Sequence, residues 1–418
     1  FDEKRRKVKK TELLLPAGNF SRMKYAIAYG ADAVYIGGEE FSLRTASGNF
    51  SLEEISEAVK YAHERNVRVY VAVNTTPHEE EVKRYPSYLK TLVHANVDAV
   101  IVGDIGLVGL TRHLAPGLKI HLSTQANAIN SAAICMWHSL GVSRVVLARE
   151  CSIDEIAKIR ENIPKEIEIE VFVHGAMCMA HSGRCLISSF LTGRDANRGN
   201  CVQACRWKYA VCEETRQGEY FPVVESDNGT FIFNSKDLCM IEHLDELVYN
   251  GISSFKVEGR VKTEYYVSCV AKAYREAIDD IFEDLSLYKK NTPKYLEELK
   301  KTSHRDFCTG FYYGNPMSEG QNYKTSGYIR DYEVVGVVGR YDYFNHMLEI
   351  EQRNKFVIGD ECEIIEPDKD PVKLIITEMR DDAGNLISAA PHAQMKVWIP
   401  FKRNVNRFGF LRRKKTDD

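Results

Sequence analysis

Five cysteines in the middle of the chain are the residues best suited to chemistry: Cys178, Cys185, Cys201, Cys205 and Cys239. The first two follow an alternating apolar and polar run that predicts a β-strand. Thiolates gathered at a strand end favour a metal or iron–sulfur site, because both take cysteine sulfur as a ligand. The irregular spacing fits a site built from loops, but spacing alone does not choose between Cys201 and Cys205.

The same cysteines are compatible with two further roles. Free cysteines pack as small apolar side chains, and four thiolates can hold a structural Zn²⁺. The residues around Cys178 and Cys185 are Gly, Ser, His and Arg, which favours ligands over core packing. Core packing is the better interpretation for the cysteines in helical, strand-end or β contexts, which are Cys135, Cys151, Cys269, Cys308 and Cys362.

A second group of polar residues lies on or just after predicted strands, and five of them are candidate catalytic residues. Arg149 and Arg260 carry planar guanidinium groups that suit an anionic, carboxylate-bearing co-substrate. Glu150 and Glu258 are equally well explained as their ion-pair partners. His174 is a candidate to move protons or to hydrogen-bond a cluster sulfur. The other polar residues at strand ends are Asn74, Asp104, His121, Ser123 and Gln125.

The elements that would position these groups alternate between short apolar runs and helical patterns. Capping boxes mark helix starts at Ser51 and Ser152, each with a glutamate three residues on. Eight strands rich in Val and Ile predict an α/β fold, a (β/α)8 TIM-like barrel with its chemistry at the carboxyl ends of the strands. A doubly wound sheet is the alternative, but its dinucleotide fingerprint is absent. The predicted strands span residues 12–16, 33–37, 68–74, 99–103, 119–124, 144–148, 168–174 and 254–258.

The same pattern divides the chain into units. We expect a basic leader over residues 1–10 and a catalytic barrel over 11–284, with a cysteine-bearing insertion at 175–253. Residues 285–305 are charged and polar and predict a helical linker. From 306 to 418 the hydrophobicity alternates with period two and glycines interrupt it, which favours a small C-terminal β-barrel domain.

Composition narrows the class of protein. Of 418 residues, 44% are hydrophobic and 28% charged, as in soluble globular proteins. The net charge of −3 gives no overall sign of nucleic-acid binding, although basic residues cluster at both ends of the chain. Eleven cysteines without paired spacing, no secretory segment and no long apolar run favour a cytoplasmic protein that does not enter the membrane.

Aromatic and basic residues mix in the C-terminal part, a combination that suits base stacking and phosphate contact. A β-domain core with charged edges would account for most of the rings. A hydrolytic function lacks its motifs, because the chain has no HExxH pair and no GxSxG elbow. The basic run near the end of the chain consists of Lys402, Arg403, Arg407, Arg412 and Arg413.

The segment around the first two cysteines resembles the signature of the collagenase-like peptidase family U32. The resemblance covers residues 11–320 and includes ELLLPAGN, GADAVYIGG, HLSTQANAIN, NSKDLC and FKVEGR. The residues that match the signature are Glu170, Phe172, Gly175, Ala176, Met177, Cys178, Gly183, Cys185, Ile187 and Ser188.

This resemblance implies a function. Well-understood members of the family are iron–sulfur proteins that hydroxylate RNA bases or quinone precursors without O2. The resemblance therefore implies a 4Fe–4S cluster held by Cys178, Cys185, Cys201 and Cys239. It is closest to the branch that makes 5-hydroxyuridine at the tRNA wobble position and requires prephenate, so the expected partners are tRNA and this small anionic co-substrate. Alternatives are a protease, as the family name says, a hydroxylase of rRNA or of a quinone precursor, and a zinc-stabilised RNA-binding protein.

Overall fold

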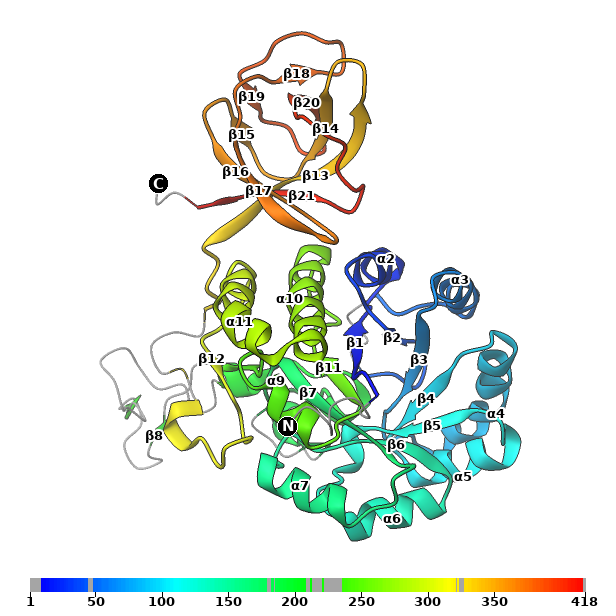
Figure 1. Cartoon of the computed structure of the whole chain (residues 1–418). Helices are drawn as coiled ribbons and strands as arrows, with labels where there is room; N and C mark the ends of the chain where they lie inside the picture. Colours follow the sequence, from blue (N-terminus) through cyan, green and yellow to red (C-terminus); the bar gives the residue numbers. More distant parts are fainter. Residues whose placement is uncertain are drawn as a thin grey trace.

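A closed barrel of eight parallel strands forms the larger part of the molecule (Figure 1). The computed structural model describes residues 9–43, 48–178, 182–183, 185–207, 211–212, 220–221, 235–320, 322 and 327–415. Strand β11 (Ser254–Val257) pairs with both β1 (Glu12–Pro16) and β7 (Glu168–Ala176), which closes the ring. The strands between them are β2 (Ala33–Gly37), β3 (Arg68–Val73), β4 (Ala99–Val102), β5 (Lys119–Leu122) and β6 (Val142–Val146). The predicted barrel is confirmed, and every strand lies within two residues of its predicted bounds.

Helices surround this barrel on its outer side (Figure 1). The capping boxes at Ser51 and Ser152 are confirmed, because each side chain accepts the backbone N–H three residues on while the glutamate there accepts in return. Within the described residues, no helix is long and apolar enough to cross a membrane. The barrel helices are α2 (Phe20–Ala28), α3 (Leu52–His63), α4 (Glu79–His94), α5 (Ile105–Leu114), α6 (Ser131–Ser139), α7 (Ile153–Glu161), α9 (Leu244–Tyr249) and α10 (Glu264–Glu283).

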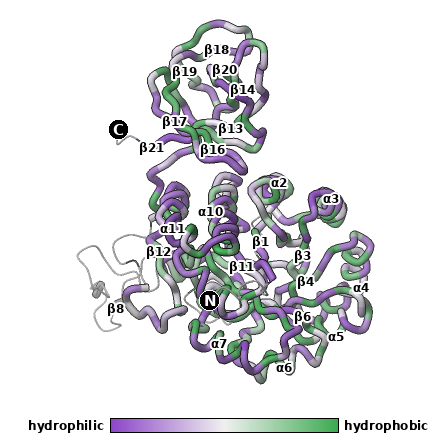
Figure 2. The backbone as a smooth tube through the Cα atoms, in the orientation of Figure 1, coloured by the Kyte–Doolittle hydropathy of each residue, from purple (hydrophilic) through white to green (hydrophobic). Residues whose placement is uncertain are grey.

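The barrel strands are buried on both faces, so their sequences are almost continuously apolar. In Figure 2 hydrophilic stretches lie on outer helices such as α3. Inside the ring, an apolar layer includes Leu14, Tyr35 and Ile101. An ionic network lies at the amino end of the barrel and a pocket at the carboxyl end, and Lys256 belongs to both.

Polar side chains inside the amino end of the barrel form a buried network. Arg144 donates to Glu12 at 2.6 Å and to Glu170 at 3.1 Å, and Lys256 donates to Glu170 at 2.9 Å. The Glu170 side chain is fully buried. Burial alone would raise the pKa of Glu170, but Lys256 and Arg144 outweigh it and lower that pKa. The network therefore fixes the Lys256 ammonium group in the centre of the barrel.

The insertion between β7 and β11 carries its own short elements. Strand β10 (Asp237–Cys239) runs antiparallel to β7. The segment before it includes α8 (Ile187–Thr192), η3 (Ala196–Arg198) and η4 (Ala204–Arg206). The short strands β8 (Val211–Cys212) and β9 (Tyr220–Phe221) pair with each other, and residues 208–210, 213–219 and 222–234 of the predicted insertion lie outside the described residues.

The boundary between the barrel and the C-terminal domain differs from the prediction. Helix α11 (Leu285–Lys300) occupies most of the predicted helical linker, but it lies along α10 and buries Tyr288, so residues 285–300 pack as part of the barrel body. Strand β12 (Phe307–Cys308) pairs with β10 in the barrel sheet. The Tyr312 hydroxyl donates to the Phe172 carbonyl at 2.6 Å. The alternating pattern after residue 306 thus begins with a strand that joins the barrel.

The C-terminal domain is an antiparallel sheet, and it stands beyond α10, α11 and α2 in Figure 1. Its seven-stranded sheet is paired in the order β17-β16-β21-β13-β14-β20-β18, with β17 and β18 at the edges rather than closed on each other as in a complete barrel. The strands are β13 (Tyr332–Asp342), β14 (Met347–Gln352), β16 (Glu361–Glu366), β17 (Lys369–Ile375), β18 (Arg380–Asp381), β20 (Lys396–Pro400) and β21 (Phe410–Lys414), with β15 (Phe356–Val357) and β19 (Ala389–Ala390) as a separate pair.

Candidate active site

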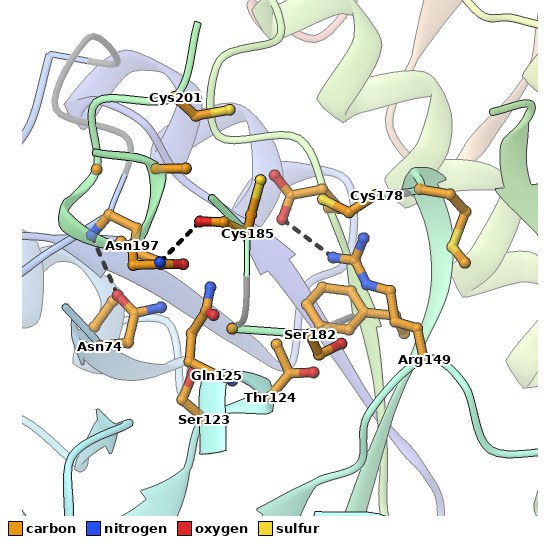
Figure 3. Close-up of a pocket in the computed structure, with 18 of the residues that line it drawn as sticks. Asn74, Ser123, Thr124, Gln125, Arg149, Cys178, Ser182, Cys185, Asn197 and Cys201 are labelled. Carbon is orange, nitrogen blue, oxygen red and sulfur yellow. Dashed lines mark hydrogen bonds and ion pairs between the residues drawn. The ribbon is translucent and has the colours of Figure 1, made fainter. Parts of the chain in front are cut away.

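A cavity of about 180 Å³ opens at the carboxyl end of the barrel (Figure 3). We call it the barrel pocket. Inward-facing strand residues such as Ile101 and Phe172 line its inner part, and residues that follow the strands form its walls. One side is made by residues 185–207, which we call the entrance segment. This is the end of the barrel at which barrel enzymes place their chemistry.

Four cysteines line the barrel pocket. They are Cys178, which is exposed, and Cys185, Cys201 and Cys205, which are half-buried. The Cys201 sulfur accepts a hydrogen bond from the Gln203 N–H at 3.3 Å. Within the described residues, no three side chains of His, Cys, Asp or Glu converge closely enough to form a metal site. The thiols therefore share a pocket, although they do not point at one centre in this arrangement.

Cys239 lies apart from that group. It does not appear among the pocket-lining residues but is buried in β10, where its sulfur lies 3.9 Å from the Tyr274 hydroxyl. Burial raises the pKa of the Cys239 thiol to about 12. The structure thus brings together three of the four predicted ligands and adds Cys205, the alternative that spacing alone could not exclude.

His174 also lies away from the pocket, and a β-bulge explains why. In a regular strand, His174 would share the inward face with Glu170 and Phe172. The pairing of β7 with β11 shifts here, because Phe172 faces Lys256 whereas His174 faces the very next residue, Val257. One extra residue on β7 turns His174 outward.

The surroundings of His174 are those of a packed core residue. It is buried against the rings of Tyr274 and Phe307. Burial, with a smaller contribution from Lys262, lowers the pKa of His174 to about 3. His174 therefore does not line the barrel pocket, where its place on the strand had predicted it. His181, the other histidine close to Cys178, lies outside the described residues.

Arg149 and Glu258 form one wall of the pocket, as predicted for residues that end β6 and β11. The guanidinium of Arg149 donates to the Ala176 carbonyl at 2.7 Å and lies 3.8 Å from the Glu258 carboxylate. Its carbon centre is 3.9 Å from the Phe172 ring centroid, a cation–π distance. Figure 3 shows Arg149 and Cys178 on this side of the pocket.

Arg260 lines the pocket too, but its two terminal nitrogens already hold protein oxygens. One donates to the Ser42 hydroxyl at 2.7 Å and the other to the Asn49 side-chain oxygen at 2.5 Å. These contacts join the loop after β11 to the loop after β2. Gly37 permits this approach, since a Cβ there would lie 2.6 Å from the Arg260 guanidinium.

Glu150 lines the pocket but faces the cysteine loop. Its carboxylate accepts the Ser182 N–H at 2.9 Å and also the Ser182 hydroxyl. The neighbouring Gly183 has a φ of +73°, and a Cβ on it would lie 2.3 Å from the Gln125 carbonyl oxygen. These contacts hold Ser182 and Gly183 against the barrel.

Lys256 is a pocket residue that the strand-end argument missed. It lies in the middle of β11, and its ammonium group is 4.7 Å from the Tyr35 ring centroid. Alternation along β11 puts Lys256 on the same face as Glu258, so a signal for it was present in the sequence. The pocket thus contains three buried or half-buried cationic groups, including those of Arg149 and Arg260.

The opposite side of the pocket carries neutral amides. Asn74 accepts the Leu43 N–H at 3.2 Å, and Asn197 donates to the Cys185 carbonyl at 2.9 Å. In Figure 3 the Gln125 side chain points toward the space below Cys185, and Asn74 lies below Asn197. Of the other predicted strand-end residues, Ser123 lines the pocket, whereas Asp104 caps α5 and His121 packs on Tyr70 inside the barrel.

The predicted basic run in the C-terminal domain is largely engaged. Arg412 is fully buried and donates to Glu298 and Glu363. Arg413 pairs with Glu333 and Asp360, and Arg403 pairs with Glu366. In this run, Lys402 and Arg407 are the residues that remain exposed. Most of the run therefore holds the domain together, and the expected surface for RNA shrinks to these two side chains.

Comparison with known proteins agrees with this architecture. The profile of Peptidase family U32 matches residues 18–322, and that of the Peptidase family U32 C-terminal domain matches residues 330–412. The second boundary agrees with the start of the C-terminal sheet at β13.

Several relatives have names that state a function, and three of them are described here. The chain is 39% identical over 407 residues to tRNA hydroxylation protein P1 of Bacillus subtilis (strain 168), covering 97% of this chain and 96% of that protein. It is 36% identical to tRNA hydroxylation protein P of Escherichia coli (strain K12), covering 95% of each. It is also 36% identical to the 23S rRNA 5-hydroxycytidine C2501 synthase of E. coli, covering 70% of this chain and 44% of that protein. With both profiles matched and two relatives aligned over nearly their full length, the chain belongs to peptidase family U32.

Proposed function

We propose that this protein is an RNA-modifying enzyme that hydroxylates a tRNA wobble uridine to 5-hydroxyuridine without O2. RNA hydroxylation is the activity named in relatives that align with the whole chain or most of it. The finer parts of the proposal are the tRNA uridine, an iron–sulfur cluster and prephenate as co-substrate. They rest on the resemblance of the cysteine segment to the family signature and on the chemistry of the barrel pocket.

The observation that carries the proposal is the two-sided composition of that pocket. Thiols of the entrance segment line one side, and Arg149, Lys256 and Arg260 bring positive charge to the other. A protease would need an activated nucleophile or a metal-bound water. Among the described pocket residues, no histidine is present to act as a base for a thiol.

The donor set fits a 4Fe–4S cluster in kind. Cys178, Cys185 and Cys201 would supply three thiolates, and the fourth would come from Cys205 on the pocket wall or from Cys239, which the resemblance implies. A bound cluster would supply electron transfer or a Lewis-acidic iron beside the pocket. The N–H of Gln203 at the Cys201 sulfur is the type of hydrogen bond that tunes such sites.

The cationic side of the pocket suits the anionic co-substrate. Prephenate carries two carboxylates, and a guanidinium binds a carboxylate through two parallel hydrogen bonds. Arg149 is placed for this role by its contacts with Ala176 and Phe172. Lys256 would add charge from the inner end of the pocket, while Arg260 would keep the surrounding loops in place.

The amide side of the pocket suits a pyrimidine base. A carboxamide offers one donor and one acceptor side by side, and the N3–H and O4 edge of uracil presents the complementary pair. The carboxamides that line the pocket are Asn74, Gln125 and Asn197, and Gln125 is the one directed toward the space below Cys185. An enzyme that modifies a base in RNA must take that base out of its stack and into such a pocket.

Nucleoside mass spectrometry of tRNA from cells that lack this protein tests the proposal. The expected result is loss of 5-hydroxyuridine, restored by the wild-type chain and not by Cys185→Ala. Unchanged 5-hydroxyuridine together with loss of 5-hydroxycytidine in rRNA would instead assign the rRNA substrate suggested by the E. coli synthase. Robust gelatin hydrolysis by iron-free protein would support the protease alternative.

A further inference from the structure

The entrance segment exposes large apolar side chains next to the barrel pocket. Phe190 is 88% exposed and Leu186 is 72% exposed, and Trp207 at the end of the segment is 44% exposed. The same stretch of chain supplies Cys185, Asn197 and Cys201 to the pocket. Apolar area gathered beside a binding site usually marks a contact surface for a partner.

Hydrogen bonds fix the conformation of the entrance segment, and this defines where its aromatic rings lie. Helix α8 contacts η4, which Trp207 follows directly. The Ser188 hydroxyl donates to the Arg194 carbonyl at 2.7 Å and accepts the Val202 N–H at 3.3 Å. Arg198 donates to Glu81 of α4 at 2.9 Å, which ties the segment to the barrel.

The charge of the entrance segment selects one kind of partner. Between residues 185 and 207 the sequence has three arginines and one aspartate, whereas the whole chain has a net charge of −3. Aromatic rings combined with arginines suit single-stranded RNA, because every base can stack on a ring and arginine neutralises phosphate. When a base leaves its stack to enter a pocket, its neighbours lose a stacking partner as well.

We propose that Phe190 and Trp207 form a stacking platform for the nucleotides that flank the hydroxylated base in a single-stranded RNA loop. The proposal rests on the proposed function, since it assumes that RNA delivers a base to the barrel pocket. It assigns to the platform a role in positioning the RNA and no role in the chemistry. The competing explanation is that a second copy of this chain or another protein binds the same surface through apolar contacts alone.

Full-length protein carrying Phe190→Ala or Trp207→Ala tests the platform by titration with an unmodified tRNA. Each variant is expected to bind tRNA about tenfold more weakly, as for loss of one stacked base. The dependence of affinity on salt should stay unchanged, because no charge is removed. Arg194→Gln should instead reduce the slope of log affinity against log salt concentration by about one, as for the loss of one phosphate contact. Phe344→Ala is the matched control, because Phe344 is 92% exposed in the C-terminal domain.

Iron content and melting temperature equal to those of the wild type would establish that the variants are folded. Unchanged tRNA affinity in both ring variants would overturn the platform. Loss of self-association in sedimentation, with tRNA affinity intact, would overturn it as well and assign the surface to protein contact. If the wild-type protein modifies tRNA and the ring variants bind like it, the platform alone fails. If the wild-type protein neither binds nor modifies tRNA, the proposed function fails with it.

Discussion

Arg149 is the pocket cation whose contacts leave its charge available. One nitrogen donates to the Ala176 carbonyl, and the guanidinium lies over the Phe172 ring. Its nearest carboxylate, that of Glu258, is 3.8 Å away, longer than a charge-assisted hydrogen bond. An anionic co-substrate could therefore approach Arg149 without displacing a tight ion pair.

Replacing Arg149 by lysine should keep the positive charge but lose the planar guanidinium group. We expect Arg149→Lys to lower kcat/KM for the anionic co-substrate at least about tenfold, because an ammonium group cannot form two parallel hydrogen bonds with a carboxylate. The measurement is the rate of hydroxylation against co-substrate concentration, with iron content and melting temperature as controls. A wild-type KM in Arg149→Lys would remove this residue from the co-substrate site.

Arg260 differs from Arg149, because its contacts predict a positioning role. Its guanidinium holds Ser42 and Asn49, so Arg260→Lys loses one of two hydrogen bonds and Arg260→Ala loses both. We expect the alanine variant to lower the free energy of unfolding by about 2–3 kcal/mol, and the lysine variant by about half of that. Urea unfolding measures both. Stability equal to the wild type, combined with a raised co-substrate KM, would return Arg260 to direct binding.

Glu170 predicts a pH dependence of stability. Its pKa is lowered in the folded chain, so the folded state binds fewer protons than the unfolded state. The stabilisation is therefore present above the unfolded pKa and is lost as the pH falls through the lower, folded pKa, starting below about pH 4.3. Glu170→Gln should cost about 3–5 kcal/mol at pH 7, because Lys256 loses its carboxylate partner.

The measurement for Glu170 is urea unfolding of the wild type and of Glu170→Gln at pH 7 and at pH 4 and below. Other carboxylates titrate in the same range, so the informative quantity is the difference between the two proteins. That difference should narrow as the pH falls. A difference that is independent of pH would show that Glu170 acts through packing and not through its charge.

At the scale of single residues, the sequence predicted which residues line the pocket better than it predicted what each of them contacts there. Arg149, Glu150, Glu258 and Arg260 all line the pocket, since barrel geometry sends residues after parallel strands to one end. Their hydrogen-bond partners come from distant loops, which strand patterns do not encode. His174 was misplaced because one bulge in β7 reverses the alternation that the prediction used.

At the scale of elements, the entrance segment and β7 together hold the cysteines that the proposed cluster needs. We expect Cys178→Ala, Cys185→Ala and Cys201→Ala each to lose iron after anaerobic reconstitution, because a cluster needs all its thiolates. Cys269→Ala and Cys362→Ala are matched controls, since both side chains are buried in other parts of the fold. Iron and sulfide analysis of the purified proteins checks this set. Stoichiometric zinc in colourless wild-type protein would support the structural zinc alternative.

The pocket and the family resemblance favour different cysteines as the fourth ligand of the proposed cluster. Cys205 lines the pocket, whereas the resemblance implies Cys239, whose thiol is buried next to Tyr274. Iron analysis of Cys205→Ala and Cys239→Ala in parallel should show loss in one variant and retention in the other. If Cys239 is the ligand, β10 must move or its side chain must turn when the cluster binds. Retention of iron in both variants would show that neither Cys205 nor Cys239 is required as the fourth ligand.

Elements with strong local signals were predictable, and those defined by tertiary pairing were not. The barrel strands follow from buried apolar runs, and the helix starts at Ser51 and Ser152 follow from capping boxes. The C-terminal domain was predicted to start at 306 because the helical pattern ends there and alternating runs follow, and β12 (Phe307–Cys308) falls inside that span. Only its pairing with β10 shows that this strand belongs to the barrel.

At the scale of the whole molecule, the C-terminal sheet is docked on the barrel helices through buried contacts. Arg412 of β21 donates to Glu298 of α11 at 2.7 Å and to Glu363 of β16 at 2.8 Å. Tyr29 of α2 donates to the Phe408 carbonyl at 3.0 Å, and Tyr25 stacks on Phe410. A basic residue that looked like an RNA contact in the sequence is thus the centre of the interface between the two domains.

This interface predicts that Arg412 governs domain docking. Arg412→Ala removes the buried arginine that joins the Glu298 and Glu363 carboxylates and leaves Lys301 as the cation beside both, which should cost about 3 kcal/mol. We expect a lower melting temperature and faster proteolysis of the segment before β13, with iron content unchanged because the cysteines lie in the barrel. Arg407→Ala is the matched control, since it removes an exposed arginine from the same domain. If Arg412→Ala melted like Arg407→Ala, the interface would depend on its apolar contacts, and Arg412 would be free to be tested again as a contact for RNA.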